Sequence, residues 1–259
     1  MTVMPQPKKW LGQHFLVDEN ILGVIGRLAA LEPQDVVLEV GPGIGVLTRY
    51  LADRVAVVHA IELDRSLEEP LRSALEGRDN VRLVLGDALV LDLASLEPAP
   101  TKLVANLPYN IATPLVLDSL DGIPSLERWC VMVQREVAQR FFAMPRTKAY
   151  GAVSVLVQLQ AHKVGFHAVP PTVFKPRPRV ESALVAFERL EGSSLQQIRP
   201  VVNAAFAHRR KTLANSLALF GLASRADAEQ ALAAIGKPPG ARAEELEPAD
   251  FVALADALR

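Results

Sequence analysis

Short apolar runs alternate with amphipathic segments through the first half of the chain. The runs are rich in Val and Leu and have the length of buried strands, whereas the apolar positions between them recur with helical spacing. We expect strands at residues 36–40, 55–61, 81–85, 102–105 and 129–133, and helices that begin near Gly45, Ser66, Ala112 and Gln134. This alternation predicts an α/β fold with a doubly wound, mostly parallel sheet, whose ligands bind at the C-terminal ends of the strands.

Two later apolar runs are expected to complete a seven-stranded sheet. They lie at residues 154–160 and 182–188, on either side of the Pro-rich segment 170–178. We expect them to form a hairpin-like pair that closes the sheet.

The two ends of the chain depart from this pattern. Residues 1–17 show no clean period and predict an ordered arm that docks through Trp10, Phe15 and Leu16, before a helix that Asp18 can cap. Beyond residue 191 only helical periodicity remains, with helices expected at residues 196–207, 211–220, 225–235 and 248–258. The chain is therefore expected to comprise a ligand-binding catalytic domain, residues 1–191, and a small all-helical domain, residues 192–259.

Composition narrows the class of protein. The 259 residues are 50% apolar and contain one cysteine, Cys130, which excludes a disulfide framework and a cysteine-based zinc site. The five histidines show no ligand spacing, so no metal site is expected. No secretory signal and no apolar run of roughly 18 residues is present, which favours a cytoplasmic protein without a membrane span.

Charge is unevenly distributed along the chain. Residues 1–127 carry a formal charge of −8, residues 128–211 carry +10 and residues 212–259 carry −3, although the whole chain has a net charge of −1. A basic central segment is typical of a surface that faces a polyanion, but a solvated face would have the same composition.

Glycines and acids follow the first three expected strands. The first strand runs into a G-x-G-x-G loop, Gly41 to Gly45, two residues after Glu39. The dinucleotide fingerprint is instead G-x-G-x-x-G, and a carboxylate beside the loop would repel a pyrophosphate but can hold a cation. Glu62, at the end of the second strand, can accept both hydroxyls of a ribose, and Asp87, after the third, can accept from an adenine amino group. Together they predict a site for S-adenosylmethionine rather than NAD.

The fourth strand delivers Asn106, Leu107, Pro108 and Tyr109 to the same edge of the sheet. The side-chain oxygen of Asn106 and the backbone carbonyl of Leu107 can each accept one N–H of an adenine N6 amino group, and Tyr109 can stack on the base. Because a sulfonium methyl group is already activated, this chemistry needs orientation of the acceptor and no general base.

With these motifs the chain resembles the small-subunit ribosomal RNA adenine N6,N6-dimethyltransferases almost from end to end. The resemblance rests on Gly12–Leu16, Glu39–Gly45, Asn106–Asn110, Phe174–Ser182 and Arg209–Leu213. It implies a Rossmann-like class I methyltransferase fold and two methyl groups on each of two adjacent adenosines near the 3′ end of 16S ribosomal RNA, within the small ribosomal subunit. A role in subunit biogenesis and a monomeric protein are also expected.

The resemblance also implies roles for individual residues. Contacts with S-adenosylmethionine are expected from His14, Leu16, Gly41, Gly43, Glu62, Asp87 and Asn106, and the target adenine is expected to meet Asn106 to Tyr109. Many members have Asn where this chain has His14. RNA contacts are expected from Arg135, Arg140, Lys175, Arg177, Arg209, Arg210 and Lys211.

Other functions fit parts of the sequence. A large-subunit ribosomal RNA adenine N6-methyltransferase of the antibiotic-resistance type shares the fold and the tetrapeptide, whereas segments 174–182 and 209–213 favour the small subunit. A non-catalytic RNA-binding assembly or transcription factor would not need the intact acids and tetrapeptide. Cys130 suggests a cytosine-C5 methyltransferase, but it lies in an apolar strand with no adjacent base.

Overall fold

The computed structural model describes residues 7–8, 12–191 and 195–259, so the predicted docking residue Trp10 lies outside the described part. The chain divides into two compact units. The first comprises residues 1–138 and 162–189, and the second comprises residues 139–161 and 190–259. Residues 139–161 thus group with the C-terminal helices, although the sequence-based boundary assigns them to the first domain.

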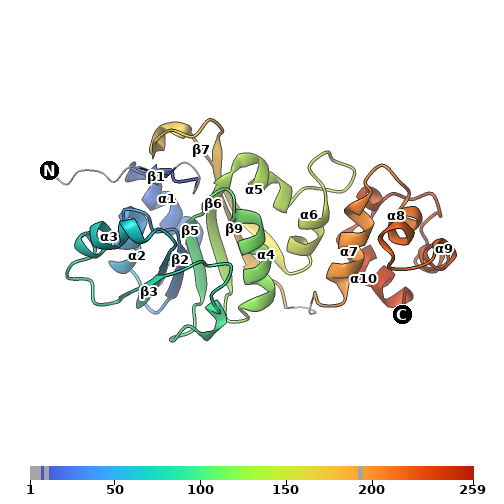
Figure 1. Ribbon diagram of the computed structural model, residues 1–259, viewed down its shortest axis with the longest axis horizontal. Helices are drawn as coiled ribbons and strands as arrows, with labels where there is room; N and C mark the ends of the chain where they lie inside the picture. Colours follow the sequence, from blue (N-terminus) through green and yellow to red (C-terminus); the bar gives the residue numbers. More distant parts are fainter. Residues whose placement is uncertain (1–6, 9–11, 192–194) are drawn as a thin grey trace. The chain divides into compact units, whose positions relative to one another are not determined.

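A seven-stranded sheet forms the centre of the first unit, with the strand order β4-β3-β2-β5-β6-β9-β7 (Figure 1). The pairs formed among β2 to β6 are parallel, and β9 runs antiparallel to β6. The strands are β2 (Val36–Val40), β3 (Val57–Glu62), β4 (Val81–Leu85), β5 (Lys102–Asn106), β6 (Arg128–Gln134), β7 (Ala161–Val169) and β9 (Ser182–Arg189). Strand β2 lies between β3 and β5, where the strand order reverses, and ligands of such sheets bind beyond the carboxyl ends at this point.

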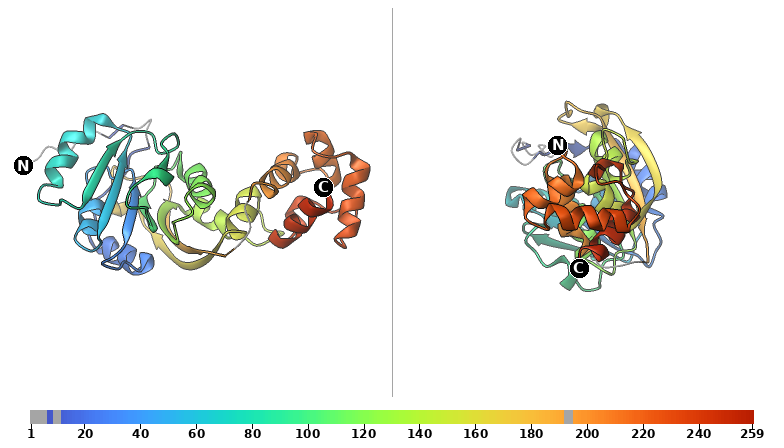
Figure 2. Two further views of the ribbon diagram at one scale, coloured as in Figure 1. Left: turned by 90° about the horizontal axis from the view of Figure 1, so that it is seen from below. Right: turned by 90° about the vertical axis from the view of Figure 1, so that its right-hand side faces the viewer.

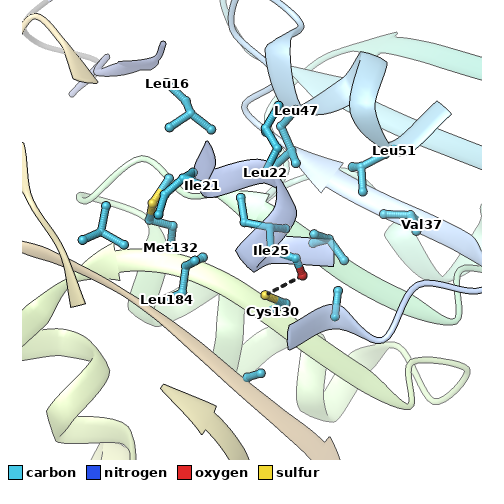
Figure 3. Packing of buried hydrophobic residues seen from close by; sticks show 14 of the residues in the cluster. Leu16, Ile21, Leu22, Ile25, Val37, Leu47, Leu51, Cys130, Met132 and Leu184 are labelled. Carbon is cyan, nitrogen blue, oxygen red and sulfur yellow. Dashed lines mark hydrogen bonds between the residues drawn. The ribbon is translucent and has the colours of Figure 1, made fainter. Parts of the chain in front are cut away.

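Helices cover both faces of this sheet, as two adjacent residues of β6 show. Neighbouring side chains of a strand point to opposite faces. The Cys130 thiol lies 3.8 Å from the carbonyl of Ile25 in α1 (Asn20–Ala29), within an apolar cluster on one face (Figure 3). The Trp129 indole donates to the Ser119 hydroxyl of α4 (Ala112–Gly122) at 2.9 Å on the other face. The doubly wound architecture is confirmed.

Of the remaining helices of the first unit, those that begin near Gly45, Ser66 and Gln134 were predicted, and the short helices after β4 and β7 were not. They are α2 (Val46–Ala52), η2 (Arg65–Leu67), α3 (Glu68–Ala74), η3 (Leu93–Ser95) and η4 (Pro171–Val173), and α5 (Arg135–Phe141) follows β6.

A second, two-stranded sheet ties the N-terminal segment to the Pro-rich loop. Strand β1 (Phe15–Leu16) pairs antiparallel with β8 (Phe174–Lys175), and the Val17 N–H donates to the Val173 carbonyl at 2.9 Å. Phe15 and Leu16 are buried, which confirms that the segment docks through them. The Asp18 carboxylate accepts from the Asn20 N–H, at the start of α1, at 2.9 Å.

One predicted strand is wrong. Residues 154–160 fall largely in a helix, α6 (Ala152–Gln158), and the strand follows it as β7. The Ser154 hydroxyl accepts from the Gly151 N–H at 3.2 Å and donates to the Arg140 carbonyl at 2.6 Å, which fixes the start of α6. Strand β7 neighbours β9, so the expected hairpin-like pair exists with a different first strand.

The second unit is all-helical, as expected for the C-terminal part of the chain. Besides α6 it contains α7 (Ile198–Ala207), α8 (Leu213–Phe220), α9 (Arg225–Ala234), η5 (Ala243–Glu245) and α10 (Pro248–Ala257). Helices α7 to α10, coloured orange to red in Figure 2, pack against one another. The rings of Phe206 in α7 and Phe251 in α10 are stacked with their centroids 5.7 Å apart. No helix in the described part of the chain has the length and apolar character that a bilayer span requires.

Candidate active site

One cavity of about 250 Å³ opens at the C-terminal ends of β2, β3, β4 and β5. Every residue that the sequence predicts to bind the cofactor or to perform the transfer lines it. These residues are His14, Leu16, Gly41, Gly43, Glu62, Asp87, Asn106, Leu107, Pro108 and Tyr109. The cavity lies wholly within the first unit.

The glycine loop forms one wall of the cavity, and two of its positions have no room for a larger side chain. Gly41 and Gly43 have φ angles of 74° and 60°, in the left-handed region that favours glycine. A Cβ atom on Gly41 would lie 3.2 Å from Pro108, and one on Gly43 would lie 2.9 Å from the Phe15 ring. The loop therefore packs closely against the tetrapeptide and the N-terminal segment.

Two backbone N–H groups hold the Glu62 carboxylate, which can still accept further hydrogen bonds. Its Oε1 accepts from the Asp64 N–H at 2.8 Å, and its Oε2 accepts from the Gly43 N–H at 3.1 Å. Burial raises the pKa of this carboxyl, and the two N–H donors oppose that effect. Since a carboxylate has about four acceptor sites, two remain for a pair of hydroxyl donors.

Glu39 differs from the expectation of a charged group beside the glycine loop. It is 1% exposed, and its Oε2 has no hydrogen-bond partner in the described part of the chain. Burial, with a smaller contribution from the Glu62 charge, raises the pKa of Glu39 to about 8. Glu39 is therefore neutral at pH 7 in this structure. It would have to lose its proton before its negative charge could stabilise a bound cation.

Asp87 and Asn106 are each fixed by a backbone contact. The Asp87 Oδ1 accepts from the Leu89 N–H at 2.9 Å, in the turn that follows β4. The Asn106 side-chain nitrogen donates to the His14 carbonyl at 3.1 Å, which orients its amide and joins β5 to the N-terminal segment.

Leu107 and Tyr109 are positioned by the neighbouring strands. The Leu107 N–H donates to the Met132 carbonyl of β6 at 3.1 Å, and no donor in the described part of the chain is bonded to the Leu107 carbonyl oxygen. The Tyr109 hydroxyl lies 2.6 Å from the Ser182 hydroxyl. Its ring lies 5.6 Å from the His14 ring, centroid to centroid. Two potential acceptors and one aromatic ring thus border the same space.

Sequence reasoning missed the network that fastens the N-terminal segment. The Asp64 carboxylate accepts from Lys8 Nζ at 2.6 Å and from Gln13 Nε2 at 2.9 Å. Burial would raise the pKa of Asp64, but the hydrogen bonds from Lys8, Ser66 and Gln13 outweigh it and lower that pKa to about 2. The available signal was the acid two residues after Glu62, which alternation places on the same side of the chain.

The predicted RNA-binding cations do not line the cavity, and some have carboxylate partners. Arg135 pairs with Glu181 at 2.6 Å, and Arg209 lies 3.8 Å from Glu244. Lys175 and Arg177 are exposed in the first unit, whereas Arg210 and Lys211 are exposed between α7 and α8 of the second. Arg140 is half-buried in the second unit.

Cys130 has no part in this site. It is 1% exposed, and burial raises the pKa of its thiol to about 12, so it holds its proton at neutral pH. In the part of the chain that the structure describes, no three or more His, Cys, Asp or Glu side chains are grouped to hold a metal ion.

Comparison with known proteins agrees with this geometry. The chain is 50% identical to the ribosomal RNA small subunit methyltransferase A of Rubrobacter xylanophilus, over 96% of this chain and 94% of that protein. The protein of that name from Kineococcus radiotolerans is 46% identical, over 96% and 85% of the two chains.

Two solved structures share the fold over most of their length. A dimethyladenosine transferase from Plasmodium falciparum has a TM-score of 0.79 at 24% identity, covering 93% of this chain and 96% of that one. The 23S rRNA methyltransferase ErmE has a TM-score of 0.68 at 31% identity, covering 94% and 99%. Residues 4–258 match the family described as ribosomal RNA adenine dimethylase, and the chain belongs to that family.

Proposed function

We propose that this chain transfers methyl groups from S-adenosylmethionine to N6 of adenine in ribosomal RNA. The observation that supports it most is that Glu62, Asp87 and the tetrapeptide Asn106–Tyr109 line a single cavity. The substrate proposed is a pair of adjacent adenosines near the 3′ end of the 16S RNA of the small ribosomal subunit, each receiving two methyl groups. The protein would then act where that subunit is assembled, in the cytoplasm.

The donor set of the cavity fits a nucleoside with a positive charge. Glu62 has acceptor sites for two ribose hydroxyls, Asp87 can accept from an amino group, and the glycines of the loop carry no side chains that would fill the cavity. Bound there, S-adenosylmethionine supplies an electrophilic methyl group on a sulfonium. Its positive charge would favour the ionised form of Glu39, which is neutral without it.

The acceptor nitrogen must be oriented, because its lone pair is delocalised into the adenine ring. Asn106 Oδ1 and the Leu107 carbonyl are proposed to accept its two N–H groups, which turns the lone pair towards the methyl group. The Asn106 amide is preset for this by its bond to the His14 carbonyl. Stacking on Tyr109 would contribute on the order of 1–3 kcal/mol to holding the base.

RNA binding is proposed to use exposed cations of both units. Lys175 and Arg177 in the first unit, and Arg210 and Lys211 in the second, have the exposure that phosphate contact needs. Arg135 and Arg209 would have to exchange or share their carboxylate partners to contact RNA, and Arg140 would contribute from a half-buried position.

A second candidate is methylation of large-subunit RNA, which the similarity to ErmE favours. The small-subunit substrate is preferred because the relatives that are 50% and 46% identical carry small-subunit names, whereas ErmE is 31% identical.

Asn106→Ala tests the proposed orientation of the acceptor. We expect it to lower methyl transfer by about 10²–10³-fold, the usual cost of losing a preorganised polar contact with the reacting group, while the fold and RNA binding remain. Transfer is measured with labelled S-adenosylmethionine and RNA binding by filter retention. Asn203→Ala, at an exposed position of α7, is the matched control. Normal turnover in Asn106→Ala would refute the role given to this residue.

A further inference from the structure

Tyr109, which follows β5, has an anchor on β9, two strands away in the sheet. Its hydroxyl lies 2.6 Å from the hydroxyl of Ser182, the first residue of β9. Ser182 is fully buried and Tyr109 is half-buried, and burial raises the pKa of Tyr109, so the contact joins two neutral hydroxyls in a partly dry site. A hydrogen bond in such surroundings fixes the ring more firmly than one in water.

The register of the sheet explains why Ser182 reaches this place. Asn106 pairs with Met132, and Met132 pairs with Leu184. Ser182 lies two residues before Leu184, so its side chain points to the same face as Leu184. This brings the β9 serine to the edge of the sheet at which β5 delivers the tetrapeptide.

The segment that carries Ser182 is itself held in place. The Glu181 carbonyl accepts from the Arg135 N–H at 2.9 Å, and the Glu181 carboxylate pairs with the Arg135 guanidinium at 2.6 Å. On the other side of the loop, the Pro176 carbonyl lies 2.8 Å from His14 Nδ1. The loop from Phe174 to Ser182 therefore supports both His14 and Tyr109, whose rings border the cavity.

We propose that Ser182 is a positioning residue for methyl transfer, whose buried hydroxyl holds the hydroxyl end of the Tyr109 ring and thereby fixes where the ring lies against the target base. This inference rests on the proposed function, because it assigns Ser182 to the same site. Without the anchor, the ring can swing about its Cα–Cβ bond, and the base would be held in the reactive orientation for a smaller fraction of the time.

A double-mutant cycle of Ser182→Ala and Tyr109→Phe tests the contact. Each single variant is expected to lower kcat about 3- to 10-fold, the worth of one hydrogen bond, with unchanged affinity for S-adenosylmethionine. The double variant is expected to be no slower than the slower single variant, because both changes remove the same bond. A wild-type kcat in either single variant, or losses that multiply in the double variant, would overturn the proposal.

Ser119→Ala is the matched control. Ser119 is also a buried serine bonded to an aromatic side chain, the Trp129 indole, but on the opposite face of the sheet. It is expected to lower the urea midpoint about as much as Ser182→Ala and to leave kcat unchanged. An equal loss of kcat in Ser119→Ala would show that the effect of Ser182→Ala is general destabilisation, which would overturn the proposal.

Fluorine NMR tests the contact between Tyr109 and Ser182 independently of the proposed function. The chain has three tyrosines, so 3-fluorotyrosine gives three fluorine resonances, and Tyr109→Phe identifies that of Tyr109. In Ser182→Ala we expect this resonance alone to shift and to change its line width, as the ring loses its anchor. An unchanged resonance would overturn the anchor even if RNA is methylated, whereas a changed one with no methylation of RNA would leave the anchor intact and refute the proposed function.

Discussion

At the scale of single residues, the site combines carboxyl groups in opposite protonation states. Asp64 is ionised because donors surround it, whereas Glu39 holds a proton because its surroundings are dry. The two groups lie at the ends of neighbouring strands, so burial and hydrogen bonding, rather than residue type, decide the charge of each.

Glu39→Gln tests the neutral state of Glu39. Between pH 4.5 and about 8 the unfolded chain loses the Glu39 proton and the folded chain keeps it, so the free energy of unfolding falls as pH rises. Glutamine removes this penalty. We expect the variant to gain stability over the wild type as pH rises from 5 to 8, by up to about 1.4 kcal/mol per pH unit, in urea unfolding without ligand.

Glu76→Gln, at an exposed position, is the control and should track the wild type at every pH. A difference between Glu39→Gln and the wild type that stays constant from pH 5 to pH 8 would show that Glu39 is ionised in the fold.

Individual site residues could be predicted from the sequence where they lie at or just after the ends of strands. Glu62, Asp87 and Asn106 follow apolar runs, and parallel strands bring such ends to one edge. Ser182 and Lys8 could not be predicted, because their partners lie 73 and 56 residues away and depend on the register of β9 and the path of the N-terminal segment.

At the scale of elements, the N-terminal segment has two attachments besides the contacts of His14 with Asn106 and Pro176. One is the β1–β8 pair, and the other is the set of hydrogen bonds that Asp64 accepts from Lys8 and Gln13. The segment supplies His14 and Leu16 to the cavity wall, so its attachment determines the shape of the site.

Asp64→Asn tests the second attachment. Because the folded pKa of Asp64 is about 2 and the ordinary value is 3.8, its contribution to stability is present above pH 4 and is lost as pH falls towards 2. We expect the variant to lose about 1–2 kcal/mol of unfolding free energy at pH 6, and the difference from the wild type to shrink at pH 3.

Asp53→Asn is the control for this measurement. Asp53 pairs with Arg78 at 3.0 Å on the surface, where such pairs contribute about 0–1 kcal/mol. Equal losses of unfolding free energy in Asp64→Asn and Asp53→Asn at pH 6 would contradict the larger contribution to stability expected of Asp64.

Helices and strands could be predicted where buried positions recur with a regular period. The prediction failed where they do not. In α6, residues 154–157 are all buried, so the run from Ser154 to Gln160 lacks the one-sided pattern of a surface helix. Strand β7 is exposed along most of its length at the edge of the sheet, so no alternation of apolar residues marks it.

At the scale of the whole molecule, the basic central segment is divided between the two units. Residues 128–138 and 162–189 belong to the first unit, and residues 139–161 and 190–211 belong to the second. Several of its cations are used internally. Arg189 donates to the carbonyls of Leu120, Ile123 and Leu126, and Arg128 pairs with Glu188. Net charge along the sequence therefore overstates the cationic surface available to RNA.

The activity proposed for the chain is dimethylation of adenine N6 in the RNA of the small ribosomal subunit. The most direct measurement incubates the protein with labelled S-adenosylmethionine and with small or large ribosomal subunits that lack these methyl groups, followed by digestion of the RNA to nucleosides. We expect label in N6,N6-dimethyladenosine from the small subunit and none in the large subunit. Label in large-subunit RNA, in another nucleoside, or in neither subunit would contradict the claim.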